Sequence, residues 1–116
     1  IRVSLFMDPI EKQIELAAFL GVNRIEFYTG PYADNYAGQE RDSILAPFAQ
    51  CAEMAEGLGL GINAGHDLNL DNLSTFCAAV PALAEVSIGH AIVTDALWMG
   101  LGRTVQKYRE ILDKFP

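Results

Sequence analysis

The sequence predicts an α/β fold in which helices cover a parallel sheet. Four times along the 116 residues, a short apolar run is followed by a longer segment whose apolar residues recur at helical spacing. Right-handed crossovers join strands that alternate with helices in this way, and such strands are parallel. The apolar (51%) and charged (20%) fractions are those of a globular domain, so a disordered chain is excluded.

The first strand–helix unit lies at the start of the chain. An apolar run over residues 3–7 predicts a strand. Asp8 then has the position of a helix N-cap, and Pro9 that of the first helical residue. Helical spacing of apolar residues continues to Gly21, which is the expected end of this helix.

The other three units follow in the same order. Further strands are predicted over residues 24–29, 59–64 and 84–88, and helices over residues 44–57, 70–79, 91–99 and 101–112. The last two helices carry Trp98 and Leu101, which we expect to pack in the core. Residues 29–40 form a loop that is rich in Gly, Asn, Asp and Tyr. Loops of this length in α/β proteins are either lids or insertions.

Spacing alone leaves two architectures open. A complete flavodoxin-like sheet has about five strands. Four units are also half of an eightfold barrel, whose usual length is about 250 residues. In both architectures the chemistry collects where the parallel strands end.

Charge and cysteine usage exclude several classes of function. The net charge is −7, with 8 basic and 15 acidic residues, which disfavours a nucleic-acid partner. No apolar run approaches the roughly 20 residues that span a bilayer. Cys51 and Cys77 lie in apolar segments without a zinc-binding pattern, so we expect buried free thiols and a cytoplasmic location.

Polar residues collect at the ends of the predicted strands. Glu26 lies within an otherwise apolar strand, where a carboxylate is costly unless it is paired. It is either an active-site carboxylate or a structural residue, for example in an ion pair with Arg24. His66 follows Gly65 just past the third strand, and histidine is the side chain most often used for acid–base catalysis. The alternative is a loop histidine that caps the next helix.

The fourth strand ends at Gly89-His90, directly before a short helix. In a barrel, this is the arrangement of a common phosphate site, in which backbone amides at a helix start face the anion. A turn glycine and a capping or core histidine are the alternatives. The glycine-rich segment 57–61 precedes its strand, whereas a dinucleotide-binding motif follows one, so that function is rejected.

Together these segments resemble the pyridoxine 5′-phosphate synthase family. The resemblance is carried by Arg2-Val3-Ser4-Leu5-Phe6, Arg24-Ile25-Glu26 with Thr29-Gly30-Pro31-Tyr32-Ala33, Asn63-Ala64-Gly65-His66-Asp67-Leu68-Asn69, and Glu85-Val86-Ser87-Ile88-Gly89-His90-Ala91. It runs along the whole chain in order. It implies that residues 1–116 are part of a TIM barrel, namely its second half with strands five to eight.

The resemblance also implies an activity. The family condenses 1-deoxy-D-xylulose 5-phosphate with 3-amino-2-oxopropyl phosphate, a transferase-type reaction that yields pyridoxine 5′-phosphate, inorganic phosphate and water. It needs no metal or organic cofactor, and it forms symmetric assemblies of barrels. By similarity His66 is the proton donor and Glu26 stabilises a transition state. Asp67, Gly89 and His90 match positions that hold the aminoketone phosphate.

The family's proton-accepting histidine and glutamate belong to the first half of the barrel. The chain begins inside an apolar run without an initiator Met, so we expect a fragment that is inactive alone. Two alternatives remain: another phosphosugar-binding barrel enzyme, such as an isomerase or aldolase, and a half-barrel that only associates with a partner chain. A catalytic Schiff-base lysine would favour an aldolase, but Lys12, Lys107 and Lys114 fall on predicted helices away from the strand ends, which argues against it.

Overall fold

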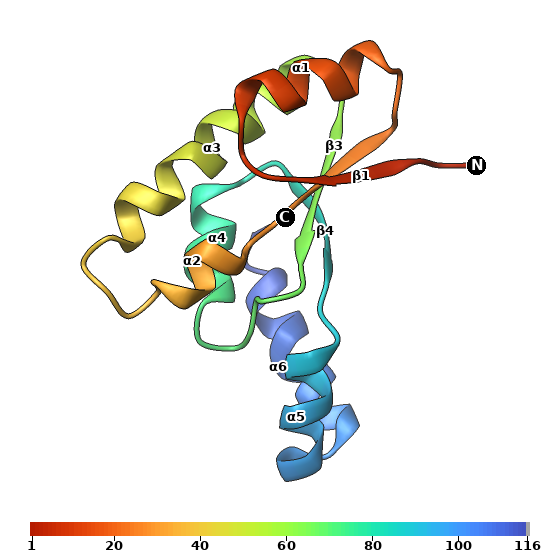
Figure 1. Cartoon of the computed structure of the whole chain (residues 1–116). Helices are drawn as coiled ribbons and strands as arrows, with labels where there is room; N and C mark the ends of the chain where they lie inside the picture. The colour runs from red at the N-terminus through yellow and green to blue at the C-terminus, as the bar shows by residue number, and fades with distance from the viewer. Residues whose placement is uncertain (116) are drawn as a thin grey trace.

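A computed structural model of the chain describes residues 1–115 (Figure 1). Strands and helices alternate as the sequence predicts. The strands are β1 (Ser4–Met7), β2 (Arg24–Phe27), β3 (Gly61–Gly65) and β4 (Leu83–Ser87). The helices are α1 (Glu11–Phe19), α2 (Gly30–Asp34), α3 (Arg41–Gly57), α4 (Leu73–Ala79), α5 (His90–Met99) and α6 (Leu101–Leu112).

The strands form one parallel sheet in the order β1-β2-β3-β4. Each strand therefore lies beside the next strand in the sequence, as in a barrel, whereas a flavodoxin-like sheet reverses its strand order. Neighbouring helices contact one another in the series α1, α3, α4 and α6. The arrangement confirms the predicted α/β class and is consistent with half of an eightfold barrel.

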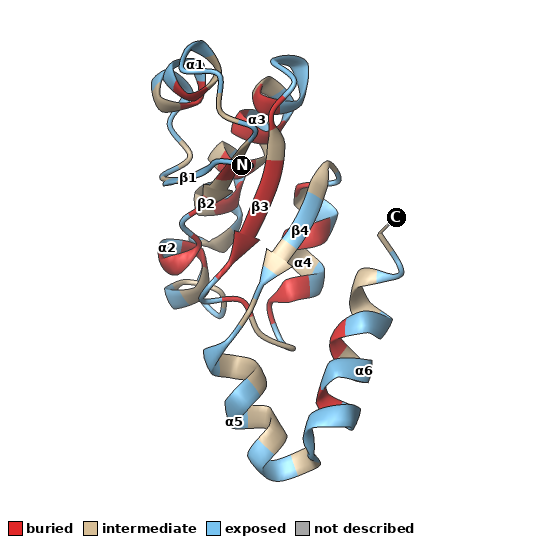
Figure 2. Cartoon of the chain, turned by 90° about the vertical axis from the view of Figure 1, so that its right-hand side faces the viewer, coloured by how far each residue is buried: buried red, intermediate tan, exposed pale blue. Residues whose placement is uncertain are grey.

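Burial differs between the strands of the sheet: β3 is buried over most of its length, whereas the residues of β4 are exposed or intermediate (Figure 2). On the helix-covered face, Ile25, Phe27, Ile62 and Ala64 are all buried. Phe27 packs edge-on against Phe48 of α3, with ring centroids 5.4 Å apart. Each fully buried side chain of this size contributes roughly 1.5–3 kcal/mol, so this side holds the core.

The opposite face of the sheet is polar. The pairing register places Phe6, Glu26, Asn63 and Glu85 in one row across the four strands. Phe6 and Glu85 are exposed in this chain, whereas Asn63 is buried and accepts a hydrogen bond from Arg24. In a closed barrel this face is the interior.

Local structure corrects three of the expected boundaries. Helix α1 begins at Glu11 with Ile10 as its N-cap, so Asp8 is not the cap. The expected loop over residues 29–40 contains the short helix α2, because Pro31 is well suited to a first helical turn. Helix α4 begins at Leu73 instead of Leu70. The side-chain Oδ1 of Asn69 accepts hydrogen bonds from the backbone amides of Asp71 and Asn72, at 2.9 and 3.0 Å, and these bonds stabilise a turn before the helix.

The expectation that Trp98 and Leu101 pack in the core is wrong. Trp98 is 87% exposed and Leu101 is 62% exposed. Both lie on the α5–α6 hairpin, which extends past the carboxyl ends of the strands (Figure 1). Within the hairpin, the Tyr108 hydroxyl of α6 donates a hydrogen bond to the Asp95 carboxylate of α5 at 3.1 Å and joins the two helices. Apolar periodicity does not reveal that only one side of this hairpin is covered.

Both cysteines are buried free thiols, as predicted, and burial raises the pKa of each. No helix within residues 1–115 is long and apolar enough to cross a membrane. Over the same residues, no group of three or more His, Cys, Asp and Glu side chains has the arrangement of a metal site.

Candidate active site

A hollow of about 600 Å³ lies where β2, β3 and β4 end. It is lined by Glu26, His66, Ser87, Ile88, Gly89 and His90. Four of these six residues are site residues predicted from the sequence. Segments more than sixty residues apart thus meet at one edge of the sheet, which is where parallel α/β folds place their chemistry.

Glu26 supplies a carboxylate to the hollow from β2. Arg24, two residues earlier on the same face, does not pair with it. Its guanidinium donates instead to Asn63 Oδ1 at 2.8 Å and to Glu85 Oε2 at 3.2 Å. Glu26 forms no ion pair or side-chain hydrogen bond with any of residues 1–115. The geometry therefore does not support the structural ion pair with Arg24 and leaves the carboxylate facing the hollow.

The end of β3 holds His66 in an unusual backbone conformation. Its φ is 50°, and it is the only residue other than glycine with a positive φ among residues 1–115. Its amide donates to the Ser87 carbonyl at 2.9 Å. A Cβ at Gly65 would overlap the same carbonyl, so only glycine allows β3 and β4 to come this close. Gly65 therefore serves strand packing.

The imidazole of His66 lies beside the ring of Phe6 on β1. Its ring centroid is 6.1 Å from that of Phe6, and Phe6 in turn lies 5.6 Å from Tyr28. The His66 side chain is exposed in this chain, and its backbone does not cap α4, whose N-cap is Asn72. The arrangement favours an imidazole that is available to a ligand.

The end of β4 is open. Gly89 is the N-cap of α5, and a Cβ there would meet no atom within 4 Å. His90 is the first residue of the helix and is exposed, so it is not a core histidine. The first amides of a helix lack intrahelical acceptors and carry partial positive charge. This end of the hollow is suited to an anion such as a phosphate.

Asp67 does not line the hollow. Its side chain is exposed, and its carbonyl accepts a hydrogen bond from Asn72 Nδ2 at 3.2 Å. Ser87 and Ile88 line the hollow but are not among the site residues predicted from the sequence. Neither is Phe6, whose ring lies beside His66. The alternation of β1 places Phe6 on the polar face of the sheet, and this signal could have identified it.

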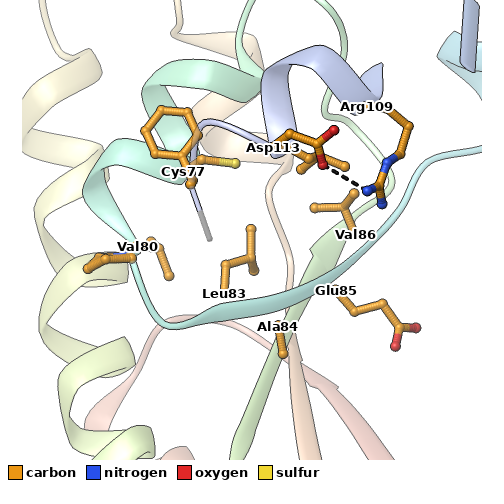
Figure 3. Close-up of a pocket in the computed structure, with 11 residues that line it drawn as sticks. Cys77, Val80, Leu83, Ala84, Glu85, Val86, Arg109 and Asp113 are labelled. Atoms are coloured by element: carbon orange, nitrogen blue, oxygen red, sulfur yellow. Dashed lines mark hydrogen bonds and ion pairs between the residues drawn. The ribbon is translucent and has the colours of Figure 1, made fainter. Parts of the chain in front are cut away.

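A second hollow, of about 460 Å³, lies outside this region (Figure 3). Its lining is mostly apolar and comes from β4, the end of α4 and the end of α6, including Val80, Leu83 and Val86. Its charged pair, Arg109 and Asp113, is satisfied at 2.7 Å. None of the predicted site residues lines it.

Comparison with known proteins identifies the family of the chain. The sequence profile of a family described as pyridoxal phosphate biosynthesis protein PdxJ matches residues 1–114. The chain belongs to the PdxJ family. Its two strand-end histidines and Glu26 are therefore considered below as parts of a PdxJ site.

Curated PdxJ relatives are named pyridoxine 5′-phosphate synthase. The chain is 54% identical over 111 residues to the protein of Xanthomonas axonopodis, covering 96% of this chain and 44% of that protein. It is 51% identical over 113 residues to the protein of Parabacteroides distasonis, and the match covers 97% of this chain and 47% of that protein. It is 49% identical over 112 residues to the protein of Christiangramia forsetii, and the match covers 97% of this chain and 47% of that protein. The chain thus spans slightly less than half the length of these relatives.

Proposed function

We propose that the full-length protein is a pyridoxine 5′-phosphate synthase, and that this chain supplies one half of its barrel. The reaction would condense 1-deoxy-D-xylulose 5-phosphate with 3-amino-2-oxopropyl phosphate and release pyridoxine 5′-phosphate, phosphate and water. The proposal is carried by one observation: in a PdxJ chain, Glu26, His66, Gly89 and His90 surround a single hollow at the strand ends.

Each residue has a role that suits its chemistry. Imine formation, loss of water and ring closure need protons to be delivered and removed, and His66 is the proposed proton donor. The Glu26 carboxylate stabilises positive charge that develops on the reacting atoms. Gly89 and His90 hold the aminoketone phosphate through amides at the start of α5. Asp67 follows His66 but does not line the hollow, so its proposed contribution is limited to its backbone amide.

The remaining groups would come from outside this chain. The second carboxylate and the second histidine, which accept protons, are proposed to lie in the other half of the barrel. Most contacts to the deoxyxylulose phosphate would lie there as well. With both phosphates anchored, binding energy remote from the reacting carbons aligns them.

The second candidate, a phosphosugar aldolase, has less support. An aldolase of the Schiff-base type needs a lysine near the substrate. Lys12 lies on α1, Lys107 lies on α6 and Lys114 follows α6, all within the described residues, and none of the three lines the hollow. Formation of pyridoxine 5′-phosphate by the full-length protein from the two phosphorylated substrates tests the proposal. Cleavage or isomerisation of a phosphosugar without that product would favour the alternative.

The half-barrel proposal has a separate test. The outer edges of β1 and β4 are unpaired within residues 1–115, and unpaired edges next to an open face promote association. We expect residues 1–116 alone to associate or to unfold without a cooperative transition. Light scattering and thermal melting measure this, and a monodisperse 12.7 kDa species with a cooperative melt would contradict it. The same measurements on the full-length protein address our proposal of a cytoplasmic homo-oligomer.

A further inference from the structure

We propose that Thr29 is a positioning residue for His66. It acts through the peptide bond between Gly65 and His66, which its hydroxyl holds in place. The inference rests on the proposed function, in which His66 is the proton donor. Thr29 itself does not line the hollow, so it is not proposed to touch the substrate.

The Gly65–His66 peptide is held at both of its polar ends. On one side, the buried Thr29 hydroxyl donates to the Gly65 carbonyl at 2.7 Å. On the other side, the His66 amide donates to the Ser87 carbonyl at 2.9 Å. The two partners come from the ends of the strands on either side of β3. Rotation of this peptide would therefore break a hydrogen bond to each neighbouring strand.

The conformation that follows this peptide requires such support. A positive φ is unfavourable for a residue with a Cβ, and it persists where the surrounding structure determines it. His66, with φ of 50°, is in this region. The orientation of the Gly65–His66 peptide sets this φ, and with it the direction in which the imidazole leaves the backbone. Small displacements of a catalytic group are costly to turnover.

Thr29 is suited to this task by its own position. It follows β2 and is the N-cap of α2, but its side chain makes no cap hydrogen bond to that helix. Its relative exposure is 0%, so the hydroxyl has no access to water as an alternative partner. The hydroxyl is therefore committed to the Gly65 carbonyl, which also accepts the Leu68 amide at 3.1 Å.

Thr104 offers a matched control. It is also fully buried, and its hydroxyl donates to the Gly100 carbonyl at 2.9 Å. That carbonyl likewise accepts a backbone amide at 3.1 Å, so the two threonines make the same kind of interaction. Thr104 lies on α6, away from the hollow. Thr29→Val and Thr104→Val each remove one such hydroxyl and nearly conserve shape.

The test compares these variants in the full-length protein. We expect Thr29→Val to lower kcat by about tenfold or more, with a much smaller change in KM for the aminoketone phosphate, because the amides of α5 are untouched. Thr29→Ser keeps the hydroxyl and should restore kcat. Thr104→Val should lower Tm by a similar amount and leave kcat unchanged. If Thr29→Val does not fold, Thr29→Ala takes its place.

Several results would overturn the proposal. These are a Thr29→Val enzyme with kcat within twofold of wild type, a Thr29→Ser enzyme as slow as Thr29→Val, or a loss of kcat in Thr104→Val that matches that of Thr29→Val. Amide hydrogen exchange gives a readout that does not depend on activity. The His66 amide should exchange at least about tenfold faster in Thr29→Val than in Thr104→Val. A wild-type protein that makes no product refutes the proposed function, while equal exchange rates refute the positioning role.

Discussion

Two Gly-His pairs end neighbouring strands of this chain, and the structure builds them in opposite ways. At Gly65–His66 the glycine is pressed against the Ser87 backbone, and the histidine has a positive φ. At Gly89–His90 the glycine borders open space, and the histidine begins a ten-residue helix. The first pair fixes the direction of one imidazole, whereas the second presents unbonded amides. We propose that the same dipeptide serves proton transfer in one place and anion binding in the other.

The largest expected effect separates the two histidines. His66→Asn keeps a polar side chain but cannot deliver a proton, so turnover of the full-length enzyme should fall by about 10²–10⁴-fold. His90→Asn should mainly raise KM for the aminoketone phosphate, because the backbone amides of α5 remain. Steady-state kinetics of both variants measure the difference. Near wild-type turnover in His66→Asn would reverse the assignment and make His90 the candidate acid.

Substitution of Glu26 tests whether its carboxylate acts in the same step as His66. Glu26→Gln should also slow turnover, since it removes the negative charge that faces the hollow. If Glu26 and His66 act in one step, the double variant should lose less than the product of the two single losses. Strictly multiplicative losses would indicate that the two residues act in separate steps.

The two glycines should differ in stability. Gly65→Ala forces β3 and β4 apart at the Ser87 carbonyl, and we expect a loss of about 3 kcal/mol or more in the free energy of unfolding. Gly89→Ala places its methyl group in open space at a helix N-cap, and the loss should stay below about 1 kcal/mol. Urea unfolding of the full-length variants measures both. Equal losses would show that the two pairs are built alike.

A larger side chain at Gly89 tests the anion site. Gly89→Val should fill space beside the α5 amides and weaken binding of the aminoketone phosphate by about tenfold, while the fold survives. Calorimetric titration of the full-length variant measures the affinity. Unchanged affinity in a folded variant would leave Gly89 as a turn residue.

The sequence predicted the architecture well, because it follows from short-range signals. Apolar runs and helical spacing located all four strands, and Gly21 ends α1 with a φ of 73° as expected. Glu26, His66, Gly89 and His90 were found because the ends of parallel strands meet at one edge. Their meeting at one hollow required no knowledge of side-chain contacts.

Contacts between distant segments could not be predicted in this way. The hydrogen bond from Thr29 to Gly65 spans 36 residues, and nothing in the local sequence marks that threonine as a partner of β3. The exposure of Trp98 depends on which side of a hairpin is covered, which periodicity does not encode. Asp8 has the sequence pattern of an N-cap, yet α1 begins at Glu11. A local sequence pattern does not fix where a helix begins when contacts with the rest of the chain also determine its start.

The smallest expected effect concerns the hydrogen bonds of Tyr32 and Asn72 next to the Gly65–His66 pair. The buried Tyr32 hydroxyl donates to the Asn72 carbonyl at 2.6 Å, and Asn72 in turn holds the Asp67 carbonyl next to His66. Burial raises the pKa of Tyr32 from 10.0 to about 12. A raised pKa in the folded state means that its stabilising contribution is complete below pH 10 and is lost as the pH rises toward about 12.

Unfolding of the full-length protein in urea at a series of alkaline pH values tests this link. We expect the free energy of unfolding to fall as the pH rises above about 10, and to fall less steeply in Tyr32→Phe, which has no phenol to ionise. The variant should also lose about 1 kcal/mol at neutral pH, because the hydrogen bond to Asn72 is gone. If the free energy of unfolding falls with pH as steeply in Tyr32→Phe as in the wild type, ionisation of Tyr32 does not cause the alkaline loss of stability. Faster exchange of the His66 amide in Tyr32→Phe, with no change at His90, would show that the phenol supports only the first pair.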